Sequence, residues 1–148
     1  MLRGMQGFWE LEEASGARTD VHGGNTLTDN NTVTQAAGKV GNAAAFASAS
    51  SEYLSRADNA ALSTGDVDFT MGFWFYLTNT SADYGFGTKG TATPNMEHSS
   101  YTTGGAPFYR AQWTIYDGDG STGATAGALD FGALSSLTWY FYVGWYDT

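Results

Sequence analysis

Two carboxylates near the start of the chain have a spacing that glycoside hydrolysis could use. Glu10 and Glu12, in "FWELEE", would share one face of an extended strand, because alternate side chains of a strand point the same way. Carboxylates paired in this manner can act as nucleophile and acid. Nothing acidic or aromatic around them repeats a glycosidase signature, so we interpret them as solvated charges on a strand edge.

The histidines do not suggest a catalytic triad either. His22 lies in a glycine-rich loop with no serine or cysteine constellation around it, and His98 lies within a predicted strand. The chain has no cysteine, which excludes thiolate nucleophiles, thiolate metal sites and disulfides. We therefore expect a protein that is not an enzyme.

Aromatic side chains occupy both faces of two long predicted strands. In "DVDFTMGFWFYLTNT", residues 66–80, the odd positions form an apolar face, and Trp74 and Tyr76 lie on the opposite face. In the last segment, residues 137–148, one face has Leu137, Trp139, Phe141, Val143 and Trp145, and the other has Tyr140, Tyr142 and Tyr146. We expect the odd positions of both strands to form the core.

The second faces of these strands need another partner, because only one side of each strand in a two-sheet sandwich faces the core. If the two strands are neighbours, the candidate ligand-binding residues are Trp74, Tyr76, Tyr140, Tyr142, Tyr146 and Arg110. Such an aromatic strip could stack sugar rings or anchor a protein interface. A third interpretation is that loops such as "STGATAGALDFG" fold over it.

The composition limits the class of protein. A chain of 148 residues predicts one domain, 1–148, and the net charge of -9, with six scattered basic residues, argues against nucleic-acid binding. No apolar run approaches the roughly 20 residues of a membrane span, and the first residues lack the apolar region of a secretory signal. Twenty glycines and 16% aromatic residues, with only 14% charged residues, favour twisted antiparallel sheet.

The pattern of alternation predicts the elements that would position these residues. Besides the two long strands, we expect strands at about 8–12, 26–28, 31–35, 42–47, 51–56, 86–89, 95–103 and 108–117. Asp58 could cap a single helical turn that ends before Gly65. Many short strands separated by turns predict an all-β sandwich or barrel.

The order of motifs resembles the laminin-G-like, concanavalin-A-like domains of phage and environmental bacterial proteins. The resemblance rests on "FWELEEASGARTDVHGGN", "GKVGNAAAFASASSEYLSRAD", "DFTMGFWFYL", "GTKG" and "LTWYFYVGWYD", and it covers nearly the whole chain. It implies an all-β fold, a jelly-roll sandwich of two antiparallel sheets. Domains of this kind usually continue beyond the last motif, so the resemblance also implies that the closing strands are missing here or supplied by a partner.

The resemblance further implies a calcium site, a function and a location. Asp20 and Asn25 match a loop that holds Ca²⁺ in many such domains, and Asp147 could join them; an Asx-type turn is the alternative. We expect a non-catalytic recognition or adhesion module that binds glycan or protein at a virion or cell surface. The alternative is a structural assembly or decoration subunit, a homo-oligomer whose aromatic face packs against its neighbours.

Overall fold

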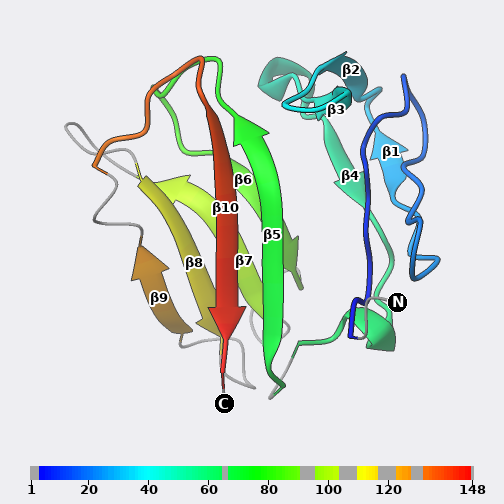
Figure 1. Ribbon diagram of the computed structural model, residues 1–148, viewed down its shortest axis with the longest axis vertical. Helices are drawn as coiled ribbons and strands as arrows, with labels where there is room; N and C mark the ends of the chain where they lie inside the picture. The colour runs from blue at the N-terminus through cyan, green and yellow to red at the C-terminus, as the bar shows by residue number, and fades with distance from the viewer. Residues whose placement is uncertain are drawn as a thin grey trace. The chain divides into compact units, whose positions relative to one another are not determined.

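The computed structural model describes residues 4–64, 67–90, 96–103, 110–116, 123–127 and 132–147. Within these residues the protein is all-β, with antiparallel strands and two short 3-10 turns (Figure 1). This confirms the predicted fold class at the level of antiparallel β-structure. The chain divides into two compact units, Met1–Leu62 and Ser63–Thr148. Two units can belong to one domain, so the single domain 1–148 stays a prediction.

The first unit has two short strand pairs. β1 (Thr28–Asn30) pairs with β4 (Tyr53–Ser55), and β2 (Thr34–Ala37) pairs with β3 (Asn42–Ala45), both antiparallel. The turns are η1 (Ser48–Ser50) and η2 (Ala60–Leu62). The predicted turn near Asp58 is therefore present, although the Asn59 side chain accepts its hydrogen bond, from the Ala61 N–H at 2.9 Å.

The strand predicted at residues 8–12 is wrong. Trp9 makes only an isolated bridge to Asp20, and Leu11 has a φ of 61°. A left-handed residue interrupts the alternation of side chains on which the shared face of Glu10 and Glu12 depended.

Buried polar groups hold the first unit together. Arg18 and Val33 are fully buried, and the Arg18 guanidinium donates from Nη2 to the Val33 carbonyl at 2.9 Å and from Nη1 to the Gly16 carbonyl. These acceptors offset part of the cost of burying the cation, although the buried Nε of Arg18 has no hydrogen-bond partner within the described residues. Arg18 therefore ties two loop segments of the unit to each other.

The second unit contains the longer strands. β5 (Phe69–Tyr76) and β10 (Trp139–Tyr146) form an antiparallel pair over eight residues each. β6 (Gly85–Lys89), β7 (His98–Thr103), β8 (Arg110–Tyr116) and β9 (Gly123–Gly127) form a four-stranded antiparallel meander in that order. The two long aromatic strands are therefore neighbours, which is the condition that the predicted aromatic strip required.

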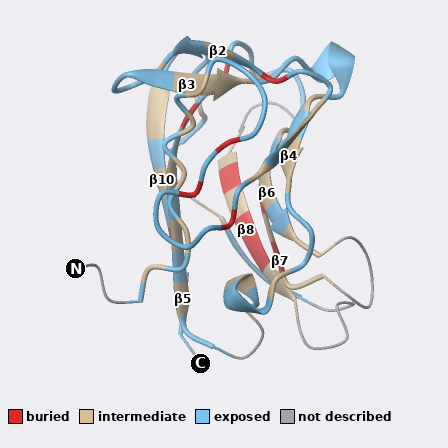
Figure 2. Ribbon diagram, turned by 90° about the vertical axis from the view of Figure 1, so that its right-hand side faces the viewer, coloured by how far each residue is buried: buried red, intermediate tan, exposed pale blue. Residues whose placement is uncertain are grey.

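Aromatic side chains join these two sheets into two layers. Phe69 of β5 contacts the Trp113 ring of β8 edge to face, at 5.2 Å between centroids, and Phe75 lies 4.4 Å from the Phe86 ring of β6. Most of the buried residues of the unit belong to β7 and β8 (Figure 2), and all of these except Thr114 alternate on the side of Trp113. The core of the second unit is therefore the space between β5–β10 and β6–β9.

Candidate functional site

The register of the β5–β10 pair decides which aromatic side chains face the core. Directly opposite residues of an antiparallel pair point to the same face. Phe75 is opposite Tyr140, Phe73 is opposite Tyr142, and Phe69 is opposite Tyr146. Since the three phenylalanines pack toward the four-stranded sheet, the three tyrosines do too.

The faces predicted for β10 are therefore reversed. Tyr140, Tyr142 and Tyr146 were expected on the free face, but they lie on the inward face. Tyr142 stacks on Phe73 at 4.9 Å, and Tyr140 stacks on Phe75 at 5.5 Å between ring centroids. Burial raises the pKa of Tyr142 to about 12, because the phenolate loses its hydration there. The structure therefore places these three half-buried tyrosines on the inward face and not on the free face where they were expected.

Gly144 is the physical reason for the reversal. Gly144 is buried, and a Cβ added there would lie 2.0 Å from Cε3 of Trp113. The even positions of β10 must therefore face β8, because only glycine leaves room for the indole. The sequence contained this signal, since a glycine inside a strand often marks a close approach of another group, but the aromatic residues on both sides obscured it.

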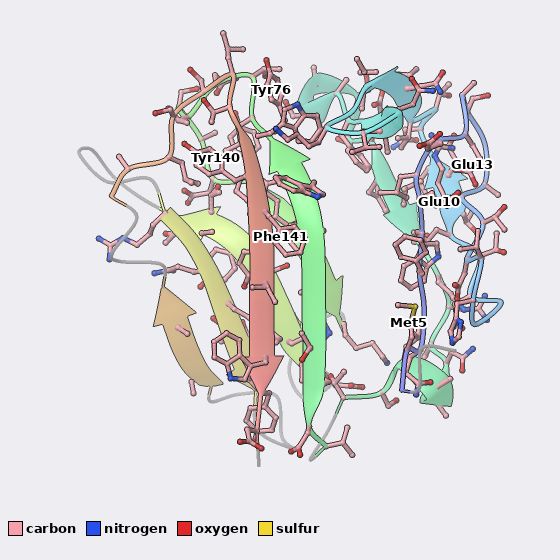
Figure 3. All side chains as sticks on the ribbon, in the orientation of Figure 1. Met5, Glu10, Glu13, Tyr76, Tyr140 and Phe141 are labelled. Atoms are coloured by element: carbon pink, nitrogen blue, oxygen red, sulfur yellow. The ribbon has the colours of Figure 1, made fainter. Side chains whose placement is uncertain are left out.

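The outer face of the β5–β10 pair is a continuous set of large apolar side chains. We call it the aromatic face; its members are Trp74, Tyr76, Trp139, Phe141, Val143 and Trp145. Trp145 is 69% exposed, Phe141 56% and Trp74 49%. Figure 3 labels Tyr76 on β5 and Phe141 on β10. Trp74 and Tyr76 are on the face that we predicted, whereas the four β10 members were assigned to the core.

Contacts between rings on the two strands fix the arrangement of side chains on the aromatic face. The Trp74 ring lies 5.1 Å from the Phe141 ring, and the Tyr76 ring lies 5.3 Å from the Trp139 ring. Tilted pairs at these separations are favourable arrangements of aromatic quadrupoles. The exposed rings therefore hold one another in place.

Arg110 does not belong to this set. Arg110 is opposite Thr103, next to the inward pair Ala111 and Thr102, and so it lies on the outer side of the four-stranded sheet. Trp74 lies on the outer side of the other layer. We correct the grouping of Arg110 with the aromatic strip, because the two side chains point away from opposite layers.

In the third interpretation, the loop "STGATAGALDFG" folds over the aromatic strip, but the described part of this loop lies in the four-stranded sheet. Gly123–Gly127 forms β9 at the edge of the four-stranded sheet, paired with β8. Residues 121, 122 and 128–131 of the same loop lie outside the described residues.

The Asp20 carboxylate, a predicted calcium ligand, is surrounded by N–H donors. Oδ1 accepts hydrogen bonds from the backbone N–H groups of Phe8, His22 and Gly23 at 2.8, 2.9 and 3.0 Å. Oδ2 accepts from the Asn25 N–H at 2.9 Å. Burial acts to raise the pKa of Asp20, but these four hydrogen bonds lower it well below its usual range. This geometry favours the Asx-type turn over a cation site.

Of the other two predicted calcium ligands, Asn25 lies beside Asp20, since its backbone N–H donates to Oδ2 of the carboxylate. The Asn25 side chain donates to the Gln6 carbonyl at 3.1 Å and accepts from Asn59 at 2.9 Å. Asp147 follows β10 and belongs to the other compact unit. Among the described residues, no group of three or more acidic or histidine side chains is arranged to hold a metal ion. Calcium binding stays a prediction.

The histidines lie where the sequence placed them. His98, only 8% exposed, lies on the inward face of β7, with its ring 5.3 Å from that of Phe69. Burial lowers the pKa of His98, and its Nδ1 has no hydrogen-bond partner within the described residues. His22 lies in the turn that Asp20 organises. The absence of catalysis stays a prediction.

Comparisons with known proteins do not identify the chain. No family model matches it, and no curated protein or solved structure was found to match it. Within the part of the chain that is described, no helix has the length and hydropathy needed to cross a membrane.

Proposed function

We propose that this protein is a non-catalytic recognition module that binds a partner protein through the aromatic face. The observation that supports this proposal best is the set of exposed rings on β5 and β10. Trp145, Phe141, Trp74, Val143 and Tyr76 are 69%, 56%, 49%, 49% and 39% exposed. Contiguous apolar surface of this kind is unfavourable in water and typically marks an interaction site.

The chemistry of the face favours a protein over a glycan. Phe141 and Val143 have no hydrogen-bonding side-chain group. Phe141 is opposite Trp74 in the register, and Val143 and Trp145 follow it on the same face of β10. Protein interfaces have such apolar centres, with tryptophan and tyrosine as anchors. A glycan also needs several polar groups around the stacking rings, and here Thr70, the Tyr76 hydroxyl and the indole N–H groups supply only a few.

The finer fold and the location are part of the same proposal. The two-layer packing of β5–β10 on β6–β9 is consistent with a laminin-G-like, concanavalin-A-like jelly roll, and the order of motifs supports it. Domains with this resemblance act as adhesion modules. We therefore propose a virion or cell surface as the setting, where the partner is a surface protein.

Binding to intact cells tests this function. The fluorescently labelled chain is added to a panel of bacterial cells, and bound label is measured before and after surface proteolysis or periodate oxidation. We expect binding that proteolysis removes, and a loss of at least tenfold in the Trp145→Ser and Phe141→Ser variants. Val40→Ser is the matched control, because Val40 is an 82% exposed apolar residue of the first unit.

Two results would contradict the proposal. Binding that periodate removes and proteolysis spares would identify a glycan as the ligand. Equal binding by the Trp145→Ser variant and the unmodified chain would remove the aromatic face from the interaction.

The second candidate is a structural assembly subunit, and the edges of the β5–β10 sheet favour it. Among the described residues this sheet has only two strands, so each eight-residue strand has one unpaired edge. Such edges readily accept a strand from another chain. Light scattering after size-exclusion chromatography distinguishes the candidates: a stable oligomer that Trp145→Ser dissociates would favour assembly, and a monomer would favour recognition.

A further inference from the structure

Two carboxylates border the aromatic face at one of its ends. The register of β5 and β10 pairs Phe69 with Tyr146, so continuing it by one step brings Asp68 opposite Asp147. Because side chains alternate along a strand, the two aspartates continue the outer face on which Trp145 lies. Both aspartates are exposed. They mark the end of the sheet at which β5 begins and β10 ends (Figure 1).

Carboxylates in this arrangement repel each other. Directly opposite residues of an antiparallel pair have Cβ atoms about 5 Å apart, and like charges at such positions are destabilising. A cation bound between Asp68 and Asp147 would remove this repulsion and make charge-assisted hydrogen bonds to both. The outer positions from 68 to 76 on β5 and from 139 to 147 on β10 include no basic residue. The aromatic face therefore has the place for a cation and supplies none itself.

The surroundings of the two aspartates suit an organic cation better than a metal ion. Among the described residues, no group of three or more acidic or histidine side chains could hold a metal ion. Trp145, 69% exposed, precedes Asp147 by two positions on the same face and lies diagonally across from Asp68. Residues on such a diagonal are about 7 to 8 Å apart, within reach of a long side chain. An indole ring attracts an ammonium or guanidinium group placed over its face.

β5 has little side-chain bulk beside Trp145. Its outer residues there are Gly72 and Thr70, both exposed, and Thr70 is opposite Trp145. A Cβ added at Gly72 would lie 3.3 Å from Cζ of Phe141, so the Phe141 ring already covers the glycine. Thr70 thus remains as a low position between the rings and the carboxylates. The methylene stem of a lysine or arginine readily lies along such a surface while its charged end reaches beyond it.

We propose that the partner segment bound by the aromatic face has a lysine or arginine at the Asp68–Asp147 end and apolar residues along the rest. The inference rests on the proposed function, because it specifies the partner of that same surface. The stem of the basic residue lies over Thr70 against the Trp145 ring, and its charged end contacts the two carboxylates. The net charge of -9 also favours the approach of a basic segment.

Selection from a random peptide library tests the proposal. The face is roughly 27 Å long from Trp139 to Asp147, at about 3.3 Å per residue, so peptides of about twelve residues can cover it. The full chain is immobilised, and peptides that the Trp145→Ser variant also retains are discarded. We expect the remaining peptides to be enriched in lysine or arginine beside apolar residues, relative to the starting library.

Affinities of one selected peptide, measured by fluorescence anisotropy, then locate its basic residue. Replacing that residue with glutamine should weaken binding to the unmodified chain about tenfold. The same replacement should change the affinity for the Asp68→Asn/Asp147→Asn double variant by less than about twofold. Asp147→Lys should bind a peptide with glutamate at that position more tightly than the original peptide. Asp83→Asn is the matched control and should keep the full difference, because Asp83 is an exposed aspartate beyond the other end of β5.

Three results would overturn the inference. Trp145-dependent peptides without an excess of basic residues would show that the carboxylates do not select the partner, and so would an equal loss of affinity on the double variant. Either result would leave the proposed binding of a protein by the aromatic face intact. A selection that returns no Trp145-dependent peptide would contradict both the inference and the proposed function.

Discussion

Gly144 of β10 lies directly beneath the Trp113 ring of β8, so close that a Cβ on Gly144 would come within 2.0 Å of Cε3 of the indole. This contact joins the two layers of the second unit and determines which side of β10 faces inward. The first prediction concerns it. Gly144→Ala should destabilise the protein by about 1 to 3 kcal/mol, because the added methyl group displaces the indole or the strand. Urea unfolding measures the loss. Gly85→Ala is the control and should change stability little, since its Cβ would meet no atom within 4 Å.

The orientation of β10 predicts opposite outcomes for two adjacent aromatic residues. Tyr142→Ala should cost about 3 kcal/mol or more, because it removes an inward ring that stacks on Phe73 at 4.9 Å. Phe141→Ala should cost about 1 kcal/mol or less, because Phe141 is 56% exposed and loses mainly its contact with Trp74. Thermal unfolding of the two variants checks the assignment, and a larger loss for Phe141→Ala would reverse it.

The Asp20 carboxylate predicts an acid-sensitive first unit. Its pKa is lowered in the folded state, so its stabilising contribution is complete above the ordinary aspartate pKa of about 4 and is lost as the pH falls below it. At neutral pH, Asp20→Asn should cost about 1 to 3 kcal/mol, since an amide cannot accept four N–H groups as an ionised carboxylate does. Urea unfolding at pH 7 and pH 3 measures both effects, with Asp147→Asn, at an exposed position, as the control.

The Asp20 loop can be tested for calcium binding by thermal unfolding. If the Asx-type turn alone explains the Asp20 hydrogen bonds, the melting temperatures in excess calcium and in chelator should be equal. A melting temperature that rises with calcium in the unmodified chain and not in Asp20→Asn would instead establish the predicted calcium site.

His98 predicts a second pH dependence, at higher pH, in the second unit. Burial favours the neutral imidazole, and the nearby charges are Glu97 and Lys89, which form an ion pair at 3.1 Å. Since the folded pKa is lowered, stability is complete above the ordinary histidine pKa of about 6.5 and falls as the pH decreases through the window below it. Unfolding free energies at pH 7.5 and 5.0 should therefore differ less in His98→Phe than in the unmodified chain. His22→Gln, in a turn, should keep the full difference.

Replacing the buried Arg18 should lower the free energy of unfolding considerably. Arg18→Met should cost about 2 kcal/mol or more, because the carbonyl of Val33 loses its buried donor and the guanidinium site is left incompletely filled. Arg56→Met is the comparison, since Arg56 is exposed and its Nη1 donates one long hydrogen bond, at 3.5 Å, to the Thr26 carbonyl. Equal stabilities of the two variants would contradict the structural role of Arg18.

The sequence alone determined the local character of this protein. Alternation of side chains predicted the long strands at β5 and β10, because period-2 patterns report directly on an extended backbone. The pattern also placed Trp74 and Tyr76 on the outer face of β5, where polar residues at the start of the strand marked the solvent side. It failed at residues 8–12, where a left-handed Leu11 breaks the alternation that the side chains suggest.

Only the tertiary structure decided which face of β10 is buried and which polar groups surround Asp20. A strand with aromatic residues on both sides has two nearly equivalent orientations, and the choice depends on Trp113, which lies about thirty residues earlier in the chain and needs the space at Gly144. Likewise, Asp20 looks like a metal ligand by residue type, but the four N–H groups that satisfy it come from the backbone, which all sequences share. Contacts between distant segments and backbone hydrogen bonds are not encoded in local periodicity, and so these features required the folded chain.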